Sequence, residues 1–392
     1  MQSPKAGNEN KPHIGIYGRC NAGKSSLLNF IADAPVAIVS PQNGTTTDPV
    51  RKSYEILGIG PVVWIDTAGT DDTSALGVER TRKTYDTMAL IDMALLVFRR
   101  WAAPERELAA CLAQRGIPTL PIHNAAAGDE SPSQEIRQEI ARLTGSELIV
   151  LRIAEHRTEE RDELLSRIGR QLPEHAYRPP SLFGDRISPN DTILLVCPID
   201  SEAPAGRLIL PQVQAIRDLL DHRCLAVVAG PEQIGTFFAL GIRPKLVVTD
   251  SQIFPEVEAL VPPGIEITSF SILLAAAKGD AALYRVGLKK ADSLKEGDRI
   301  LIAENCTHQV SCEDIGRSKI PRWLETYTGI SLRFDFVSGL APLPSDLSSY
   351  ALMVQCGGCM ATRSQIANRI RAAVAAGVPV TNYGMLIRKI RK

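Results

Sequence analysis

The sequence has no net charge, few aromatic residues and no long hydrophobic run. Its 44 Lys and Arg balance 44 Asp and Glu, and Phe, Trp and Tyr make up 5% of the 392 residues. A balanced chain without a basic block gives no electrostatic reason to expect bulk nucleic-acid binding. No apolar run approaches the roughly 18 residues that indicate a membrane span, and the polar N-terminus lacks the apolar core of a signal peptide. We therefore expect a cytoplasmic protein that binds neither nucleic acid nor membrane.

Cysteine usage argues against a disulfide-stabilised secreted scaffold. The eight cysteines are not arranged as such a framework, and a chain of this length buries enough core to fold without one. We therefore expect a reducing compartment. The length suffices for two or three domains.

The chain does contain a repeated alternation of short apolar segments with amphipathic ones. In the first block this alternation predicts strands at 13–18, 62–66, 93–98, 119–124 and 147–151. The rhythm is typical of parallel βαβ units with helices on both faces of a sheet. A stretch rich in Pro, Gly and charge at 173–191 predicts a linker, and two more α/β blocks follow it. We therefore predict an α/β protein with domains at 1–175, 176–264 and 265–392.

A phosphate-binding loop is predicted near the N-terminus. The stretch "GRCNAGKS", from Gly18 to Ser25, matches G-x-x-x-x-G-K-S/T and lies between a predicted strand and a predicted helix. Its glycines let backbone N–H groups face the phosphates, and the helix N-terminus adds partial positive charge. We expect Lys24 to reach the β and γ oxygens and Ser25 to coordinate Mg²⁺.

Two further segments complete a predicted hydrolysis site. In "DTAG", Asp66 is expected to hold Mg²⁺ through water and the Gly69 N–H to sense the γ-phosphate. In "NGTTTDPV", Thr46 is the predicted Mg²⁺-contacting residue, with Thr45 as the alternative. The predicted catalytic residues are Lys24, Thr46, Asp66 and Gly69. The predicted nucleotide-contacting residues are Gly18, Asn21, Ala22, Gly23, Lys24, Ser25, Ser26, Asp66, Gly69 and Asn124.

The C-terminal block carries a second pattern of metal-ligand type. Cys306 and His308 follow one predicted strand, and Cys356 and Cys359 of "QCGGC" follow another. Because parallel strands end at the same edge of a sheet, the two pairs are expected to converge. Three interpretations stay open on spacing alone: a redox pair, a closed Cys₃His zinc site, or three thiolates holding an iron–sulfur cluster with one iron exchangeable. Cys312 is a possible spare ligand.

The nucleotide motifs resemble the TrmE–Era–Der branch of translation-factor-like GTPases. The resemblance implies that Asn21 supports a K⁺ ion whose charge stabilises the transition state. The guanine-specificity element departs from the family pattern, because "NAAAGD" keeps Asn124 but has Ala125 and Ala127 where Lys and Asp belong. Without that carboxylate, guanine selectivity is expected to be weaker. Asp129 lies two residues late, and in the following base-flanking segment Ala154 alone fits.

The whole set of motifs resembles the HydF family of FeFe-hydrogenase maturation GTPases. The resemblance rests on the phosphate loop, "GTTTDPV", "DTAGTDD", "CTH", "EDIGRSKIPRWL", "CGGCM" and the tail "VPVTNYGM". It implies a GTPase domain, a middle domain that forms a homodimer, and a C-terminal domain that binds a 4Fe–4S cluster. It also implies a scaffold that receives a diiron precursor from two radical enzymes and delivers it to apo-hydrogenase.

The same resemblance assigns the cluster to Cys306, Cys356 and Cys359. Gln355 stands where the family usually has His, so the fourth position is left to His308, Cys312 or solvent. The alternative function is a divergent GTPase regulator outside hydrogenase assembly, with a structural zinc or a redox-sensing metal site.

Overall fold

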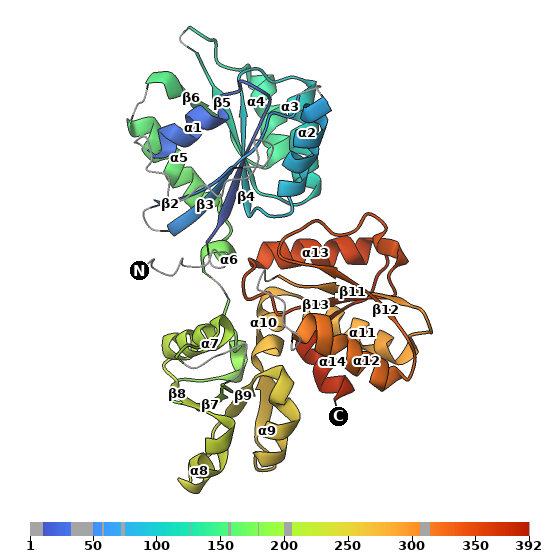
Figure 1. Ribbon diagram of the computed structural model, residues 1–392. Helices are drawn as coiled ribbons and strands as arrows, with labels where there is room; N and C mark the ends of the chain where they lie inside the picture. The colour runs from blue at the N-terminus through green and yellow to red at the C-terminus, as the bar shows by residue number, and fades with distance from the viewer. Residues whose placement is uncertain are drawn as a thin grey trace. The chain divides into compact units, whose positions relative to one another are not determined.

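The architecture is taken from a computed structural model, which describes residues 11–32, 50–56, 59–71, 75–126, 128–155, 158–178, 180–199, 206–305 and 314–391. The chain forms two compact units, residues 1–179 and 180–392 (Figure 1). No helix within these described ranges is long and apolar enough to cross a membrane.

The first unit is built on a six-stranded sheet with the strand order β2-β3-β1-β4-β5-β6. All neighbouring strands are parallel except β2 and β3, which are antiparallel. The strands are β1 (His13–Tyr17), β2 (Val50–Ile56), β3 (Gly60–Asp66), β4 (Met93–Phe98), β5 (Thr119–Asn124) and β6 (Ile149–Leu151). The helices are α1 (Lys24–Ala32), α2 (Ala75–Thr87), α3 (Ala103–Gln114), α4 (Gln134–Thr144), α5 (Thr158–Gln171) and α6 (Glu174–Tyr177).

The five strands predicted in this block are confirmed, and β2 was missed. Its sequence, "VRKSYEI", contains several charged and polar residues, which fits a strand at the edge of the sheet. By contrast β4 lies in the middle and is buried along its whole length. One apolar cluster covers each face of the sheet, and these clusters include Trp64 and Phe98 respectively. Burial on both faces is what produces the nearly continuous apolar strands seen in the sequence.

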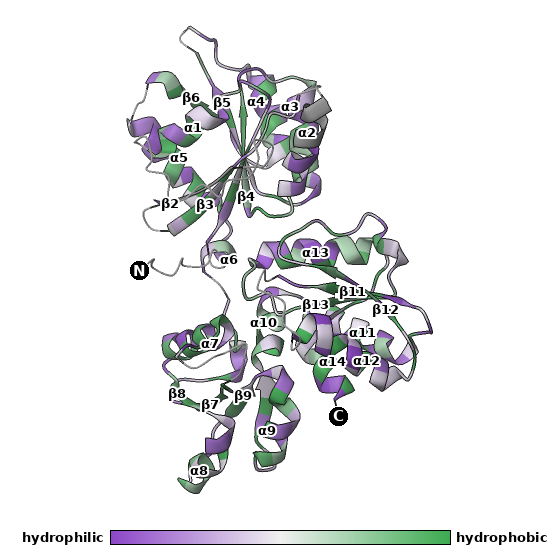
Figure 2. Cartoon of the chain, in the orientation of Figure 1, coloured by the Kyte–Doolittle hydropathy of each residue, from purple (hydrophilic) through white to green (hydrophobic). Residues whose placement is uncertain are grey.

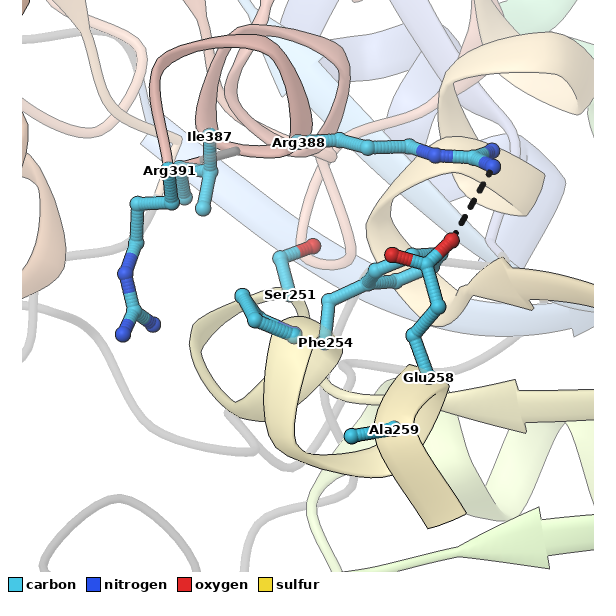
Figure 3. Close-up of a pocket in the computed structure, with 8 residues that line it drawn as sticks. Ser251, Phe254, Glu258, Ala259, Ile387, Arg388 and Arg391 are labelled. Carbon is cyan, nitrogen blue, oxygen red and sulfur yellow. Dashed lines mark ion pairs between the residues drawn. The ribbon is translucent and has the colours of Figure 1, made fainter. Parts of the chain in front are cut away.

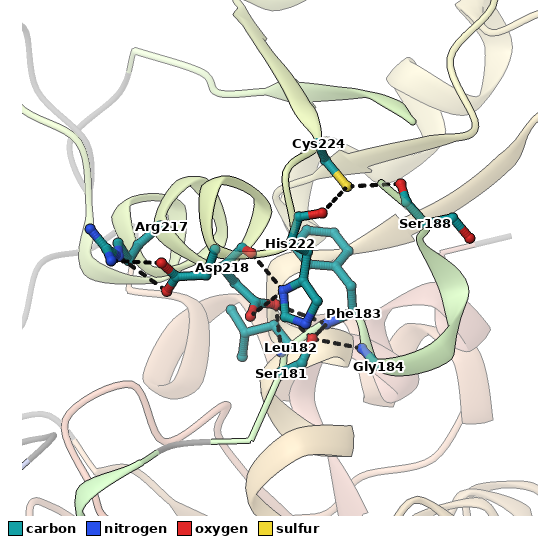
Figure 4. A network of polar contacts seen from close by, with 10 residues as sticks. Ser181, Leu182, Phe183, Gly184, Ser188, Arg217, Asp218, His222 and Cys224 are labelled. Carbon is teal, nitrogen blue, oxygen red and sulfur yellow. Dashed lines mark hydrogen bonds and ion pairs between the residues drawn. The ribbon is translucent and has the colours of Figure 1, made fainter. Parts of the chain in front are cut away.

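The predicted boundary between residues 175 and 176 falls inside α6. Ala176 of that helix is buried in the core of the first unit, so the unit extends to residue 179. The predicted linker is also more ordered than its composition indicates, because Phe183 and Ile187 are buried in the core of the next domain. There the Asp218 carboxylate accepts hydrogen bonds from Ser181 Oγ at 2.9 Å and Leu182 N at 2.8 Å (Figure 4).

The same network resembles a Ser–His–Asp triad in composition but not in geometry. Ser181 donates to Asp218, and His222 Nδ1 lies 3.3 Å from the other oxygen of that carboxylate (Figure 4). A triad needs the serine beside the imidazole. This network therefore ties the entering chain to the domain and is not a hydrolase site.

The second unit contains two parallel four-stranded sheets, ordered β10-β9-β7-β8 and β12-β11-β13-β14. The first consists of β7 (Thr192–Val196), β8 (Leu225–Ala229), β9 (Leu246–Thr249) and β10 (Glu266–Ser269). The second consists of β11 (Arg299–Ala303), β12 (Arg333–Val337), β13 (Leu352–Gln355) and β14 (Val380–Asn382). The helices are α7 (Leu210–Asp221), α8 (Ile234–Ala239), α9 (Phe254–Leu260), α10 (Phe270–Lys278), α11 (Ala281–Lys290), α12 (Ile320–Thr328), α13 (Arg363–Ala375) and α14 (Tyr383–Ile390).

The predicted boundary between residues 264 and 265 separates β10 from the sheet to which it belongs. β10 pairs with β9 along its length, so the middle sheet ends at Ser269. The following helix α10 contributes to both cores: Phe270 and Leu273 pack in the middle domain and Ala275 packs in the C-terminal domain. Strands β7, β8 and β9 of the middle sheet are mostly hydrophobic (Figure 2), whereas β10, "EITS", is mostly polar.

Candidate functional site

The phosphate loop between β1 and α1 has a backbone that its glycines make possible. Gly18 and Gly23 have φ angles of +148° and +101°, a region that side chains disfavour. Space is also lacking, because a Cβ on Gly18 would lie 2.1 Å from the Val97 carbonyl oxygen. Asn21 adopts a φ of +60°, which Asn tolerates better than most residues. The loop therefore wraps around the N-terminus of α1, where backbone N–H groups can face an anion.

Lys24 lies within this loop and is 8% exposed. Its Nζ donates to the carbonyls of Gly18 at 3.0 Å and Arg19 at 2.8 Å. Burial lowers the pKa of Lys24, while the nearby Asp66 and Asp71 carboxylates act in the opposite direction. The ammonium group is thus held inside the loop, where phosphate oxygens would complete its neutralisation.

The end of β3 brings the second motif against the loop. Ser25 Oγ donates to Asp66 Oδ2 at 2.9 Å, so the two predicted Mg²⁺-associated side chains are adjacent. Gly69 approaches the loop so closely that a Cβ on it would lie 2.3 Å from Cys20 Sγ. The position therefore requires glycine, and its backbone lies beside the phosphate loop.

Asp71 is a contact that the sequence motifs did not indicate. Its Oδ1 accepts a hydrogen bond from the Cys20 backbone N–H at 2.6 Å. Although burial acts to raise it, the pKa of Asp71 is lowered by the hydrogen bonds from Cys20. A second unpredicted contact joins Arg19 Nε to Glu105 on α3 at 2.6 Å. Both partners are distant in sequence from the loop, so no local motif marks them.

The base-specificity segment contacts the phosphate loop through the amide of its asparagine. Asn124, at the end of β5, donates from Nδ2 to the Ala22 carbonyl at 3.0 Å. Asp129 closes the turn that follows, because its Oδ2 accepts from the Ala126 N–H at 2.7 Å. Ala154 is exposed on the short 3₁₀ turn after β6. Ala127 lies outside the described residues.

Of the other predicted nucleotide contacts, Ala22 is buried and Ser26 is exposed at the start of α1. Thr46 and its alternative Thr45 lie outside the described residues. Their predicted contact with Mg²⁺ stays a prediction.

The "CGGC" loop (residues 356–359) leaves the C-terminal end of β13, which pairs with β11 so that Gln355 lies opposite Ala303. Two residues beyond Ala303, the backbone N–H of Asn305 donates to Cys356 Sγ at 3.1 Å. The two strands are therefore neighbours in the sheet, while the expected convergence of the two ligand pairs stays a prediction. Asn305 precedes Cys306 in the sequence, but Cys306, His308 and Cys312 lie outside the described residues.

Two of the predicted metal ligands, Cys356 and Cys359, lie within the described residues. Both side chains are partly buried, and neither is in a disulfide bond. Burial raises the pKa of Cys356 to about 11, and N–H donors from Gly358 and Asn305 act against this rise. Gly358 has a φ of +69°, which lets the loop turn its N–H groups toward sulfur. Among the described residues no group of three or more His, Cys, Asp or Glu side chains gathers for a metal ion, and this search includes two of the predicted ligands.

Gln355 is fully buried and turned into the domain. Its Nε2 donates to Asn305 Oδ1 and to the Ala303 carbonyl, the latter at 3.3 Å. It therefore braces the ends of β11 and β13. Two buried cations, Lys278 and Arg369, donate to backbone carbonyls around this end of the sheet.

A cavity of about 300 Å³ lies elsewhere in the second unit, between α9 and α14 (Figure 3). The arginines that line it form ion pairs, Arg388 with Glu258 at 3.9 Å and Arg391 with Glu256 at 3.2 Å. The cavity shares no lining residue with either candidate site.

The fold and the loop between β1 and α1 define the first unit as a P-loop GTPase domain, with Asp66 at the end of β3 and Asn124 at the end of β5. Matches to protein-family models support this class and cover most of the rest of the chain as well. Residues 13–125 match the family model of the 50S ribosome-binding GTPase, residues 182–279 the Hydrogen maturase F dimerization domain, and residues 282–392 the Hydrogen maturase F tetramerization domain. The last two matches together cover more than half of the chain. The chain belongs to the hydrogen maturase F (HydF) family of GTPase fusions.

Curated relatives match the GTPase domain. The tRNA modification GTPase MnmE of Nitrosospira multiformis is 36% identical over 123 residues, which are 30% of this chain and 27% of that protein. The same enzyme of Chloroflexus aurantiacus is 39% identical over 129 residues, or 31% of this chain and 27% of that protein. The chain thus spans about a quarter of the length of these relatives.

Two solved structures match parts of this chain at low identity. A variant of Aquifex aeolicus Era bound to GDP·AlF₄⁻ matches over 65% of this chain and 98% of its own, with 18% identity and a TM-score of 0.34. The G domain of T. maritima FeoB matches over 41% and 99%, with 18% identity and a TM-score of 0.31.

Proposed function

We propose that this chain is a scaffold for FeFe-hydrogenase maturation that binds and slowly hydrolyses GTP and carries a 4Fe–4S cluster on Cys306, Cys356 and Cys359. In this proposal it receives a diiron precursor from radical maturation enzymes and delivers it to apo-hydrogenase. The observation that carries the proposal is the presence, in one chain, of a phosphate loop of GTPase geometry and a partly buried "CGGC" loop at the end of β13. Membership of the hydrogen maturase F family supports the combination.

The geometry of the phosphate loop supports specific roles in hydrolysis. Lys24 neutralises the β and γ oxygens, while Ser25, with Asp66 beside it, provides for Mg²⁺. Thr46 would add a Mg²⁺ contact, and the Gly69 N–H would bind the γ-phosphate. Asn21 would hold K⁺ beside the phosphates, where its charge substitutes for an arginine finger. Arg19 does not fill that role, because its side chain is paired with buried Glu105.

The residues at the "CGGC" loop fit a thiolate-ligated cluster. Cys356 and Cys359 provide two soft ligands, and the Gly358 and Asn305 N–H groups stabilise a thiolate at Cys356. Gln355 is buried and hydrogen-bonded to neighbouring strand ends, so the fourth position falls to His308, Cys312 or solvent. When bound, a cluster with one open iron provides a place where cargo can attach and leave.

Self-association is the third part of the proposal. One edge of the middle sheet is formed by β8. The side chains of Leu225 and Val228 on this strand are 61% and 45% exposed. The opposite edge strand, β10, carries the charged residue Glu266, which forms an ion pair with Arg186. An apolar edge strand without charged residues favours pairing with a second copy. We propose that β8 forms the homodimer contact. The hydrogen maturase F dimerization and tetramerization matches support an oligomer.

Anaerobic reconstitution of the full-length chain tests the cluster assignment. The expected result is a 4Fe–4S signal by electron paramagnetic resonance after reduction, with matching iron and sulfide contents. Cys356→Ser and Cys359→Ser should each lose the signal, while Cys111→Ser, a partly buried cysteine on α3, should keep it. Zinc in place of iron and sulfide would instead support the regulator alternative. Added imidazole or cyanide should shift the signal if one iron is open.

A further inference from the structure

The "CGGC" loop is held from behind by a buried lysine. Lys278, the last residue of α10, is 7% exposed. Its Nζ donates to the carbonyls of Gly358 at 2.9 Å, Cys359 at 3.3 Å and Ala361 at 2.9 Å. An ammonium group has three N–H donors to offer, whereas a neutral amine has two. Because a buried charge is costly unless hydrogen-bonded, these contacts keep the ammonium in one place.

The same contacts set the direction of the loop's peptide groups. In a trans peptide the carbonyl and the next N–H point in opposite directions, and the described residues contain no cis peptide bond. Since the Gly358 and Cys359 carbonyls point at Lys278, the N–H groups of Cys359 and Met360 point away from it. The Gly358 N–H donates to the Cys356 thiol. The loop therefore turns its acceptors toward the lysine and its donors away from it.

Lys278 comes from a different domain than the loop that it contacts. It lies at the end of the segment that matches the dimerization domain, and the loop lies in the segment that matches the tetramerization domain. The helix α10 is fixed in both cores, through Phe270 and Leu273 on one side and Ala275 on the other. The loop is thus hydrogen-bonded to a helix that packs in both cores.

We propose that Lys278 is a positioning residue that fixes the "CGGC" loop and raises the reduction potential of the cluster bound there. The second part rests on the proposed function. A thiolate-ligated cluster gains negative charge on reduction, and its potential depends on the charges and hydrogen bonds around it. A fixed cation behind the loop favours the reduced form, and so its removal favours the oxidised form.

The test of the charge compares midpoint potentials of reconstituted full-length variants. At any fixed potential, Lys278→Met and Lys278→Gln should lower the ratio of reduced to oxidised cluster about tenfold, which is about 59 mV for one electron. Lys278→Arg should keep the wild-type midpoint. Lys289→Met, which removes an exposed lysine on α11, is the matched control. Loaded Lys278→Met or Lys278→Gln protein with the wild-type midpoint would overturn the electrostatic role.

Hydrogen exchange of the metal-free protein tests the positioning role separately. Amides of residues 357–361 should exchange faster in Lys278→Met and Lys278→Gln than in wild type, and Lys289→Met should leave them unchanged. Equal exchange in all four proteins would overturn the positioning role. If Lys278→Met does not fold, Lys278→Gln carries the comparison, because its amide keeps N–H donors. Failure of the wild-type chain to assemble a cluster would count against the proposed function and leave the exchange result standing.

Discussion

Gly69 and Cys20 approach each other so closely that a Cβ on Gly69 would lie 2.3 Å from Cys20 Sγ and 2.5 Å from the Cys20 backbone nitrogen. Two segments separated by 49 residues in the sequence are thus close together. The contact brings the backbone of the predicted γ-phosphate sensor to the phosphate loop.

Gly69→Ala should therefore slow GTP hydrolysis. Overpacking of this kind costs about 1–3 kcal/mol, so turnover is expected to fall roughly ten- to a hundred-fold, while GDP binding, which needs no γ-phosphate contact, should change little. Gly169→Ala on α5 is the control, because its added Cβ would meet Ile59 at an ordinary 3.5 Å. Single-turnover assays and GDP titrations measure the two quantities. Unchanged turnover would remove Gly69 from the site.

Lys24→Ala should abolish measurable hydrolysis, because it removes the cation that the loop carbonyls hold against the phosphate position. Lys245→Ala, a change at an exposed lysine of the second unit, should leave turnover at the wild-type value.

In the wild-type protein, K⁺ buffer should give faster turnover than Na⁺ buffer. Equal rates in the two buffers would contradict the role of Asn21.

Asn124→Ala should weaken nucleotide binding and lower the melting temperature. It deletes the hydrogen bond to the Ala22 carbonyl, and leaving a buried acceptor unpaired costs about 1–3 kcal/mol. A loss of about 1.4 kcal/mol corresponds to a tenfold weaker dissociation constant. Calorimetry with GDP and thermal unfolding without nucleotide separate the two effects. Wild-type affinity in the variant would show that the contact does not shape the phosphate loop.

Selectivity for guanine should be weak. Asp129 closes its own turn through the Ala126 N–H, which leaves GTP and ITP competing on nearly equal terms. Competition of GTP, ATP and ITP measures the preference. A strong preference for GTP over ITP that disappears in Asp129→Ala would contradict this expectation, because Asp129 would then be the replacement acceptor.

Val228→Lys should dissociate the proposed homodimer, because it places a charge on the exposed edge strand β8. Ala110→Lys adds the same charge to an exposed position of α3 and should leave the mass unchanged. Light scattering at micromolar concentration compares the two variants. A wild-type monomer with the cluster intact would contradict the dimer, and a Val228→Lys protein of wild-type mass would remove β8 from the contact.

The sequence by itself determined the α/β class and the phosphate loop. It also determined the strands that precede the motifs in the N-terminal and C-terminal blocks. These features depend on local pattern: apolar segments of strand length, and glycines at positions that require a positive φ, as Gly23 does. It also determined that Cys356 follows a strand, since "YALMV", which ends two residues before it, is an apolar segment of strand length. The polar edge strand β2 was missed, and the structure ends the first unit at residue 179 and the middle sheet at Ser269. Edge exposure and strand pairing depend on neighbours that are distant in the chain.

The tertiary structure alone decided which side chains brace the two sites. Glu105 reaches Arg19 from α3, and Lys278 reaches the "CGGC" loop across 80 residues of sequence from Gly358. Neither pairing has a local signature, because hydrogen bonds and ion pairs of this kind form wherever the folded chain brings a donor to an acceptor. Short motifs can be recognised in the sequence because their residues are close together in the chain. The charges and contacts that hold those motifs in place depend on how whole domains pack.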